Sequence, residues 1–217
     1  ALKWACELLP TGQVMFILGL GCCALFWTMI KRKQGKIISR AFFIPAVMLR
    51  TTGEAIAVIF IFLALIHSAF TTVSAILQTL PLLLTLISFL FLGEKVGLHR
   101  TLAVCIGFAG VLLIIRPGVE NFDVFSLYAV LAVIGMSMRD IGSRLSPVSI
   151  SAPILAFYGA TTFVVIGLVM MAFEAAVMPS WEAAGYLLAM IVFASGGTYY
   201  STLAMRLGEI SVISPLR

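Results

Sequence analysis

The sequence predicts an all-α, polytopic transmembrane helix bundle, and three observations carry this prediction. The first is composition: 62% of the 217 residues are hydrophobic and only 11% are charged, whereas about a quarter of a soluble domain is charged. The second is that apolar segments recur along the whole chain, with a mean hydropathy of +1.15. Lipid offers no partner to an unpaired backbone group, so each segment is expected to span as a helix.

The expected spans follow from length, because a helix needs about 20 apolar residues to cross the hydrocarbon layer. The segments that meet this requirement are residues 12–30, 50–66, 70–92, 99–116, 124–142, 149–173 and 183–204. Residues 1–8 resemble the tail of an earlier span, and 208–217 the opening of a later one. We therefore expect a partial chain.

The third observation is that the connections alternate in charge. The basic connections are residues 31–40, 94–100, 139–144 and 206–209. The connections between them, which are not basic, are residues 67–70, 116–123 and 173–182. Cytoplasmic connections carry the excess of Lys and Arg, so this alternation predicts a multi-pass protein of the bacterial inner membrane. It also accounts for the net charge of +5 without nucleic acid. The lipid bilayer is the expected partner.

A faint internal repeat suggests how the spans are organised. Residues 62–77 align without gaps to 202–217, at an offset that places an odd number of spans between the copies. The copies then have opposite orientations in the membrane. This is the inverted-repeat plan of many secondary transporters.

Three stretches together resemble the EamA-type transporters of the drug/metabolite transporter (DMT) superfamily. The first is a helix ending in Leu-Gly-Glu, followed by a basic turn and by a Gly-containing helix that closes with Arg-Pro. The second is ALIHSAFTTVSAILQTLPLLLTLISFLFLGE, which contains Ala64 and Pro81. The third is MRDIGSRLSP. The first stretch is carried by Leu92, Gly93, Glu94, Arg100, Gly107, Gly110, Arg116 and Pro117.

The resemblance implies ten helices in two inverted five-helix repeats, of which about seven helices are complete here. The first repeat is expected over residues 1–118, with helix 1 truncated and helices 2 to 5 present. The second is expected over 119–217, with helices 6 to 8 and the start of helix 9. Helix 10 and most of helices 1 and 9 are absent from the expected count.

A proline in the fourth span marks the first candidate substrate site. Pro81 lies near the middle of this span, and its missing N–H deprives the Leu77 carbonyl of a helical partner. Gln78 and Thr79 stand beside this kink, and Pro215 opens the corresponding helix of the second repeat. Transporters place substrates at broken helices near the midplane. The alternative is a packing kink in which Gln78 bonds to a neighbouring helix.

Tyrosines supply further substrate-binding candidates. Tyr199 and Tyr200 lie inside an apolar run, although aromatic residues usually gather at the membrane interfaces. The resemblance implies that this eighth helix borders the cavity, where the rings could stack on an aromatic or heterocyclic substrate. Tyr158 is a candidate of the same kind.

Charged residues inside the spans are candidates for coupling or gating. Glu54 either pairs with Arg50, one turn away, or faces an aqueous cavity and takes up a proton. Arg50 is expected to snorkel to the cytoplasmic surface. Arg139 and Asp140 are adjacent, so they point about 100° apart on a helix and should serve different partners. They form either an ion pair across helices or a gate, or they provide a charge for an ionised substrate.

No catalytic or metal-binding motif is present: there is no HExxH, no phosphate-binding loop and no GxSxG, and the four cysteines have no zinc spacing. We therefore predict no cofactor, no metal and no enzyme. The prediction is a secondary-active permease of small organic metabolites, resembling carriers of amino acids, nucleosides or S-adenosylmethionine. It works by alternating access, driven by protons or exchange, with a homodimer as one option. The alternatives are a membrane-embedded enzyme or lipid-handling protein, and a non-transporting scaffold.

Overall fold

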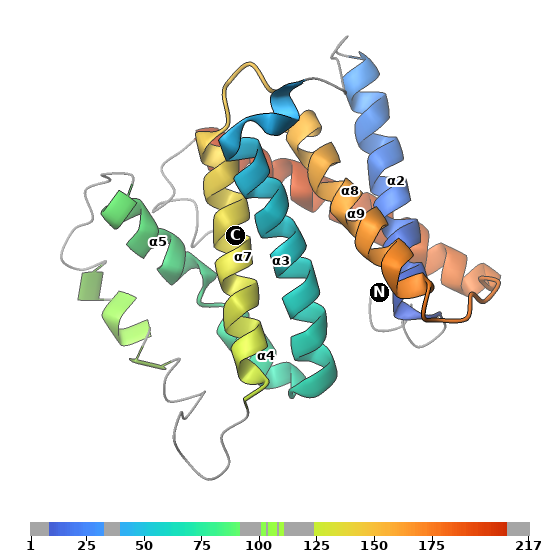
Figure 1. Ribbon diagram of the computed structural model, residues 1–217, viewed down its shortest axis with the longest axis horizontal. Coiled ribbons are helices and arrows are strands. Elements are labelled where there is room, and N and C mark those ends of the chain that lie inside the picture. Colours follow the sequence, from blue (N-terminus) through green and yellow to red (C-terminus); the bar gives the residue numbers. More distant parts are fainter. Residues whose placement is uncertain are drawn as a thin grey trace. The chain divides into compact units, whose positions relative to one another are not determined.

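The computed structural model describes residues 9–32, 40–91, 101–102, 104–107, 109–110 and 124–207, and every regular element in these ranges is helical. The predicted all-α class is confirmed. Leu92, Gly93, Glu94, Arg100, Arg116, Pro117 and Pro215 lie outside the described residues. In chain order the elements are α2 (Thr11–Arg32), the short 3₁₀ helix η1 (Arg40–Phe43), α3 (Pro45–His67), α4 (Phe70–Leu77), α5 (Leu80–Phe91), α7 (Ser126–Leu145), α8 (Ala152–Met171) and α9 (Trp181–Leu207) (Figure 1).

The described residues contain 5 helical stretches long and apolar enough to cross a membrane. They are Thr11–Arg32, Pro45–His67, Phe70–Leu90, Ala152–Met171 and Trp181–Leu207. The protein is therefore a multi-pass membrane protein, as predicted. α7 is less apolar because Arg139, Asp140 and Arg144 lie within it.

Two helix boundaries differ from the sequence prediction. α7 continues to Leu145, so residues 139–144 form its last turns and not a connection. α3 begins at Pro45, several residues before the expected start of that span. Proline is favoured in the first turn of a helix because its missing N–H has no helical partner there.

The chain divides into two compact units, each built from segments far apart in the sequence. Unit 1 comprises residues 1–51 and 145–203, and unit 2 comprises 52–144 and 204–217. Each unit takes segments from both predicted repeats. The repeat boundaries themselves stay a prediction.

Unit 1 is organised around a close contact between α2 and α8, which lie side by side (Figure 1). Glycines make this contact possible: a Cβ atom at Gly19 would lie 2.7 Å from the Val164 backbone nitrogen, and one at Gly167 would collide with the Phe16 backbone. In membranes, where lipid is as apolar as Leu, such close backbone approach supplies dispersion contacts that hold helices together.

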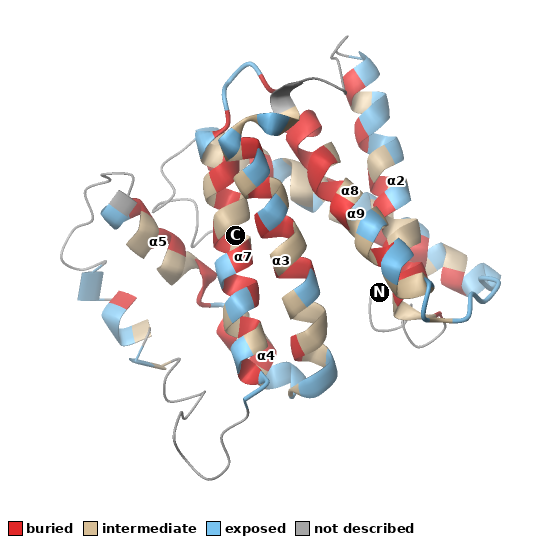
Figure 2. Cartoon of the chain, viewed as in Figure 1, coloured by how far each residue is buried: buried red, intermediate tan, exposed pale blue. Residues whose placement is uncertain are grey.

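Side-chain burial in unit 1 suits a lipid environment. The face of α8 toward α2 is buried (Figure 2), with Leu155 and Ala156 fully enclosed. Large apolar residues are instead exposed on α9: Leu188, Val192 and Phe193. An exposed apolar surface of this kind is expected where a helix faces lipid.

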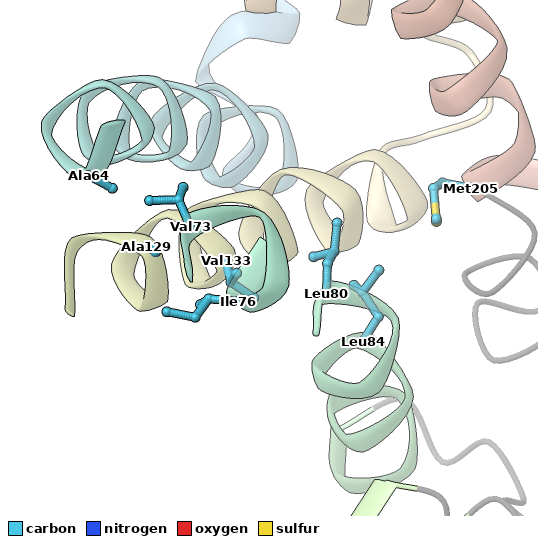
Figure 3. Packing of buried hydrophobic residues seen from close by; sticks show 8 residues of the cluster. All are labelled: Ala64, Val73, Ile76, Leu80, Leu84, Ala129, Val133 and Met205. Carbon is cyan, nitrogen blue, oxygen red and sulfur yellow. The ribbon is translucent and has the colours of Figure 1, made fainter. Parts of the chain in front are cut away.

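Unit 2 contains an apolar cluster in which α3, α4, α5 and α7 meet the last turn of α9 (Figure 3). Its buried members are Ala64, Val73, Ile76, Leu80, Leu84, Ala129, Val133 and Met205. The α3 and α7 backbones approach closely at Gly53 and Gly135, where a Cβ atom on Gly53 would lie 2.7 Å from the Gly135 carbonyl oxygen. This approach determines which polar side chains can meet.

Candidate functional site: a buried charged cluster on α3 and α7

Three charged side chains meet inside unit 2, and we call Glu54, Arg139 and Asp140 the charged cluster. Arg139 Nη1 lies 3.5 Å from Glu54 Oε1, and Arg139 Nε lies 3.0 Å from Asp140 Oδ1. Glu54 and Asp140 are almost entirely buried, at 6% and 2% exposure. One guanidinium therefore links carboxylates from two helices in the interior of a membrane protein.

The glycine contact explains why these side chains reach one another. Gly53 immediately precedes Glu54, and Gly135 lies one turn before Arg139. A Cβ atom at Gly53 would lie 2.5 Å from the Arg139 backbone nitrogen. Because no side chain separates the two backbones, Glu54 can extend to the Arg139 head group across the helix boundary.

Buried charges are costly to hold, and the energetics constrain what the charged cluster can be. Removing one partner of a buried ion pair costs about 3–5 kcal/mol, while replacing a whole pair by apolar residues is often neutral. A buried pair is therefore weak support for a purely stabilising role. Ionisable residues inside membrane spans more often mark ion, proton or substrate pathways.

The structure corrects two expectations about charged residues. Arg139 and Asp140 were expected to serve different partners, yet they contact each other, because the long Arg side chain folds back toward its neighbour. Arg50 was expected to snorkel, but it is fully buried and its Nη2 donates to Thr202 Oγ1 at 3.3 Å. A hydroxyl on another helix thus offers the guanidinium a partner inside the protein.

The structure divides the fourth span at the predicted position. α4 ends at Leu77 and α5 begins at Leu80, with Gln78 and Thr79 between them. Pro81 lies in the first turn of α5, where a missing N–H carries no penalty. Gln78 is exposed, whereas Thr79 is buried and donates its hydroxyl to the Ile76 carbonyl at 2.6 Å. Within the described part of the chain, no side-chain hydrogen bond or ion pair joins either residue to the charged cluster.

The candidate tyrosines belong to unit 1 and occupy different surroundings. Tyr158 is buried in an apolar cluster, and its ring packs edge-on against Phe42 with centroids 5.4 Å apart. Tyr199 packs against the cluster around Phe26, while Tyr200 is 69% exposed. The Tyr199 and Tyr200 rings contact each other at 5.2 Å. Their role in substrate binding stays a prediction.

The sequence analysis missed a polar connection at the start of α2. The Gly12 backbone N–H donates to Glu174 Oε2 at 2.8 Å. The Gln13 side chain both donates to the Val177 carbonyl and accepts from the Val177 N–H, at 2.6 and 3.0 Å. The available signal was the pair of glutamates in 173–182, Glu174 and Glu182; local spacing does not show that one of them meets α2.

Comparison with known proteins gives the family. The model of the EamA-like transporter family matches residues 1–116, which is more than half of the chain. The chain belongs to the EamA-like transporter family. This confirms the resemblance of the three sequence motifs to the family. The two relatives of this EamA chain described next are both named as transporters.

Two relatives illustrate the range of this family. An S-adenosylmethionine uptake transporter of Rickettsia bellii is 31% identical over 98 residues, or 45% of this chain and 34% of the relative. A riboflavin transporter of Brucella anthropi is 30% identical over 160 residues, or 70% of this chain and 55% of the relative. The chain thus spans between about a third and just over a half of these relatives. No solved structure matches it significantly.

Proposed function

We propose that the protein is a secondary-active transmembrane transporter of small organic metabolites that works by alternating access. The observation that carries this proposal is the charged cluster, which joins α3 and α7 inside a bundle of apolar helices. Family membership and the names of the relatives support it. Both named substrates, S-adenosylmethionine and riboflavin, combine a heteroaromatic ring system with polar groups.

In this proposal the candidate residues have separate roles. Gln78 and Thr79, at the break between α4 and α5, provide polar contacts for substrate, as broken helices do in other transporters. Tyr158, Tyr199 and Tyr200 supply rings for stacking on the substrate. Glu54 is the coupling group, and it contacts Arg139 on α7. The two predicted repeats, 1–118 and 119–217, alternate around the substrate.

The coupling role of Glu54 can be tested by transport. The whole protein is reconstituted in proteoliposomes, and uptake of S-adenosylmethionine and riboflavin is measured with and without an imposed pH gradient. If one proton moves with each substrate molecule, a gradient of one pH unit allows about tenfold accumulation of the substrate. We expect Glu54→Gln to remove the response to the gradient, because the amide cannot release a proton.

Glu182→Gln is the matched control. Glu182 is exposed at the start of α9, where it contacts the Tyr186 hydroxyl, so this variant should keep the wild-type response. If Glu54→Gln accumulates substrate with an unchanged dependence on the gradient, coupling does not pass through Glu54. If the wild-type protein moves no probe, the transporter proposal itself is wrong for these substrates.

A further inference from the structure

The last turn of α2 carries positive charge that no described acidic side chain neutralises. Lys31 and Arg32 are both exposed, and within the described part of the chain neither forms an ion pair. The connection that they open, residues 31–40, contains five basic residues and no acidic one. The helix dipole supplies only about half a negative charge at this end. The charge is therefore available to an anion from outside the chain.

An aromatic ring holds one of these two cations beside the boundary between α2 and α8. Lys31 Nζ lies 5.3 Å from the centre of the Trp27 ring, within the range of about 6 Å for a cation–π contact. Trp27 is 41% exposed and also packs against Phe157 of α8, with ring centroids 6.3 Å apart. The ammonium is thus positioned over a contact between two helices of unit 1.

The Trp27 ring is one end of a continuous row of aromatic rings in unit 1. From Phe157 the row continues through Tyr158 and Phe42 to Phe43, with centroid separations of 6.3, 5.4 and 5.6 Å. It ends at Phe43 of η1, which is 72% exposed. The rings come from α2, α8 and η1 at the same end of unit 1 (Figure 1). Aromatic residues gather at the level of the lipid headgroups, so this row indicates where the membrane surface crosses unit 1.

One exposed face of α2 leads from this charge into the apolar part of the helix. Leu20, Ala24, Trp27 and Lys31 follow one another at spacings of four, three and four, which places them on the same side of a helix. All four are exposed. The face is therefore cationic at its end and apolar along its length, and this order matches that of a phospholipid, with its headgroup above its acyl chains.

We propose that this end of α2 binds an anionic phospholipid. Lys31 and Arg32 contact the phosphate, and the acyl chains lie along Trp27 and Leu20. The apolar face favours a lipid over free phosphate, because inorganic phosphate has no group to place there. A basic residue near an anionic membrane surface contributes roughly fivefold in affinity. A zwitterionic lipid gains less, because its own ammonium offsets its phosphate. The inference does not depend on the transport function proposed above.

The first test compares two lipids on the whole protein, purified in a neutral detergent. Thermal unfolding is followed while phosphatidylglycerol or phosphatidylcholine is added, because a ligand that binds the folded state raises the melting temperature. We expect the apparent affinity for phosphatidylglycerol to be at least about tenfold higher, since two cations contribute. The double variant Lys31→Gln/Arg32→Gln should lose this preference. The matched control, Lys31→Arg/Arg32→Lys, keeps both charges and should retain it.

A second pair of variants tests the role of the ring without changing charge. Trp27→Leu should lower the affinity for phosphatidylglycerol about two- to fivefold, the range expected for an exposed cation–π contact. Trp181→Leu is the control, because Trp181 is exposed at the start of α9 and is followed by Glu182 and not by a basic residue. If Trp27→Leu does not fold, the lipid comparison and the surface charge variants decide the question.

Three outcomes would overturn the lipid site. The first is equal stabilisation of the wild-type protein by the two lipids. The second is a Lys31→Gln/Arg32→Gln variant that keeps the preference for phosphatidylglycerol. The third is inorganic phosphate that abolishes the effect of phosphatidylglycerol at the same concentration, which would indicate a simple anion site that makes no use of the apolar face.

Discussion

Gly53 and Glu54 are adjacent residues of α3 that together make the contact with α7 possible. The glycine lets the α3 backbone touch α7, and the glutamate that follows uses this proximity to reach Arg139. The sequence showed Glu54 as an intramembrane carboxylate, but the partner from α7 lies 85 residues away. Nothing in local spacing could have selected Arg139, because the pairing depends on how two helices approach each other.

We expect Gly53→Ala to destabilise the protein by about 1–3 kcal/mol, the usual range for adding a methyl group to a packed interior. The added Cβ would lie 2.5 Å from backbone of α7, which cannot move aside as a flexible side chain can. Thermal unfolding in detergent measures the change. Gly185→Ala on α9 is the control, since a Cβ there meets nothing within 4 Å; equal melting of the two variants would count against the packing argument.

The helices were largely predictable, whereas their ends and interruptions were less so. Apolar length alone located α2, α8 and α9, because each is a nearly unbroken apolar run. α7 was predicted to end too early, since Arg139 and Arg144 resembled a connection. The charged residues remain helical because protein partners satisfy them: Asp140 for Arg139, and the Arg206 carbonyl for Arg144. Hydropathy cannot detect such partners.

The first turn of α2 depends on a distant carboxylate. Glu174 accepts from the Gly12 N–H, and an anion at a helix N-terminus also interacts favourably with the helix dipole. We expect Glu174→Ala, which removes the accepting oxygen, to lower the free energy of unfolding by about 0.5–2 kcal/mol, as the loss of a helix cap does. Thermal unfolding of Glu174→Ala is compared with that of Glu182→Ala, since the Glu182 side chain is exposed and its loss removes the same charge without the contact to Gly12. If the Glu182 variant melts at as low a temperature as the Glu174 variant, the effect comes from the loss of a negative charge and not from the contact with Gly12.

The multi-pass character follows from composition, but the orientation of the spans comes from charge alone. Exposed Leu188, Val192 and Phe193 on α9, set against the buried charges of α3 and α7, give the inverse of a soluble protein's distribution. The two inverted repeats remain a prediction. Each compact unit combines residues from both sides of the expected repeat boundary at residue 118, so the units do not correspond to the repeats. The distribution of Lys and Arg predicts that residues 67–70 and 173–182 face the outside.

Cysteine labelling of the whole protein tests this orientation. In a background that lacks the native cysteines, Ser68→Cys and Ser180→Cys should react with an impermeant maleimide added to intact cells. Ser149→Cys, in the connection between α7 and α8, should react only after the cells are permeabilised. Labelling of all three positions from the same side would contradict the alternating topology and, with it, the inverted repeats.

The contact between Gly53 and Gly135 also limits how α3 and α7 can move relative to each other. With backbone against backbone, α3 cannot slide along α7 by one residue, because Thr52 or Glu54 would then have to occupy the space that Gly53 leaves. We therefore expect the two helices to move together, so that Glu54 and Arg139 stay in the same register. In the alternating access proposed above, the change between inward and outward states would therefore come from tilting α3 and α7 together, and not from sliding one along the other.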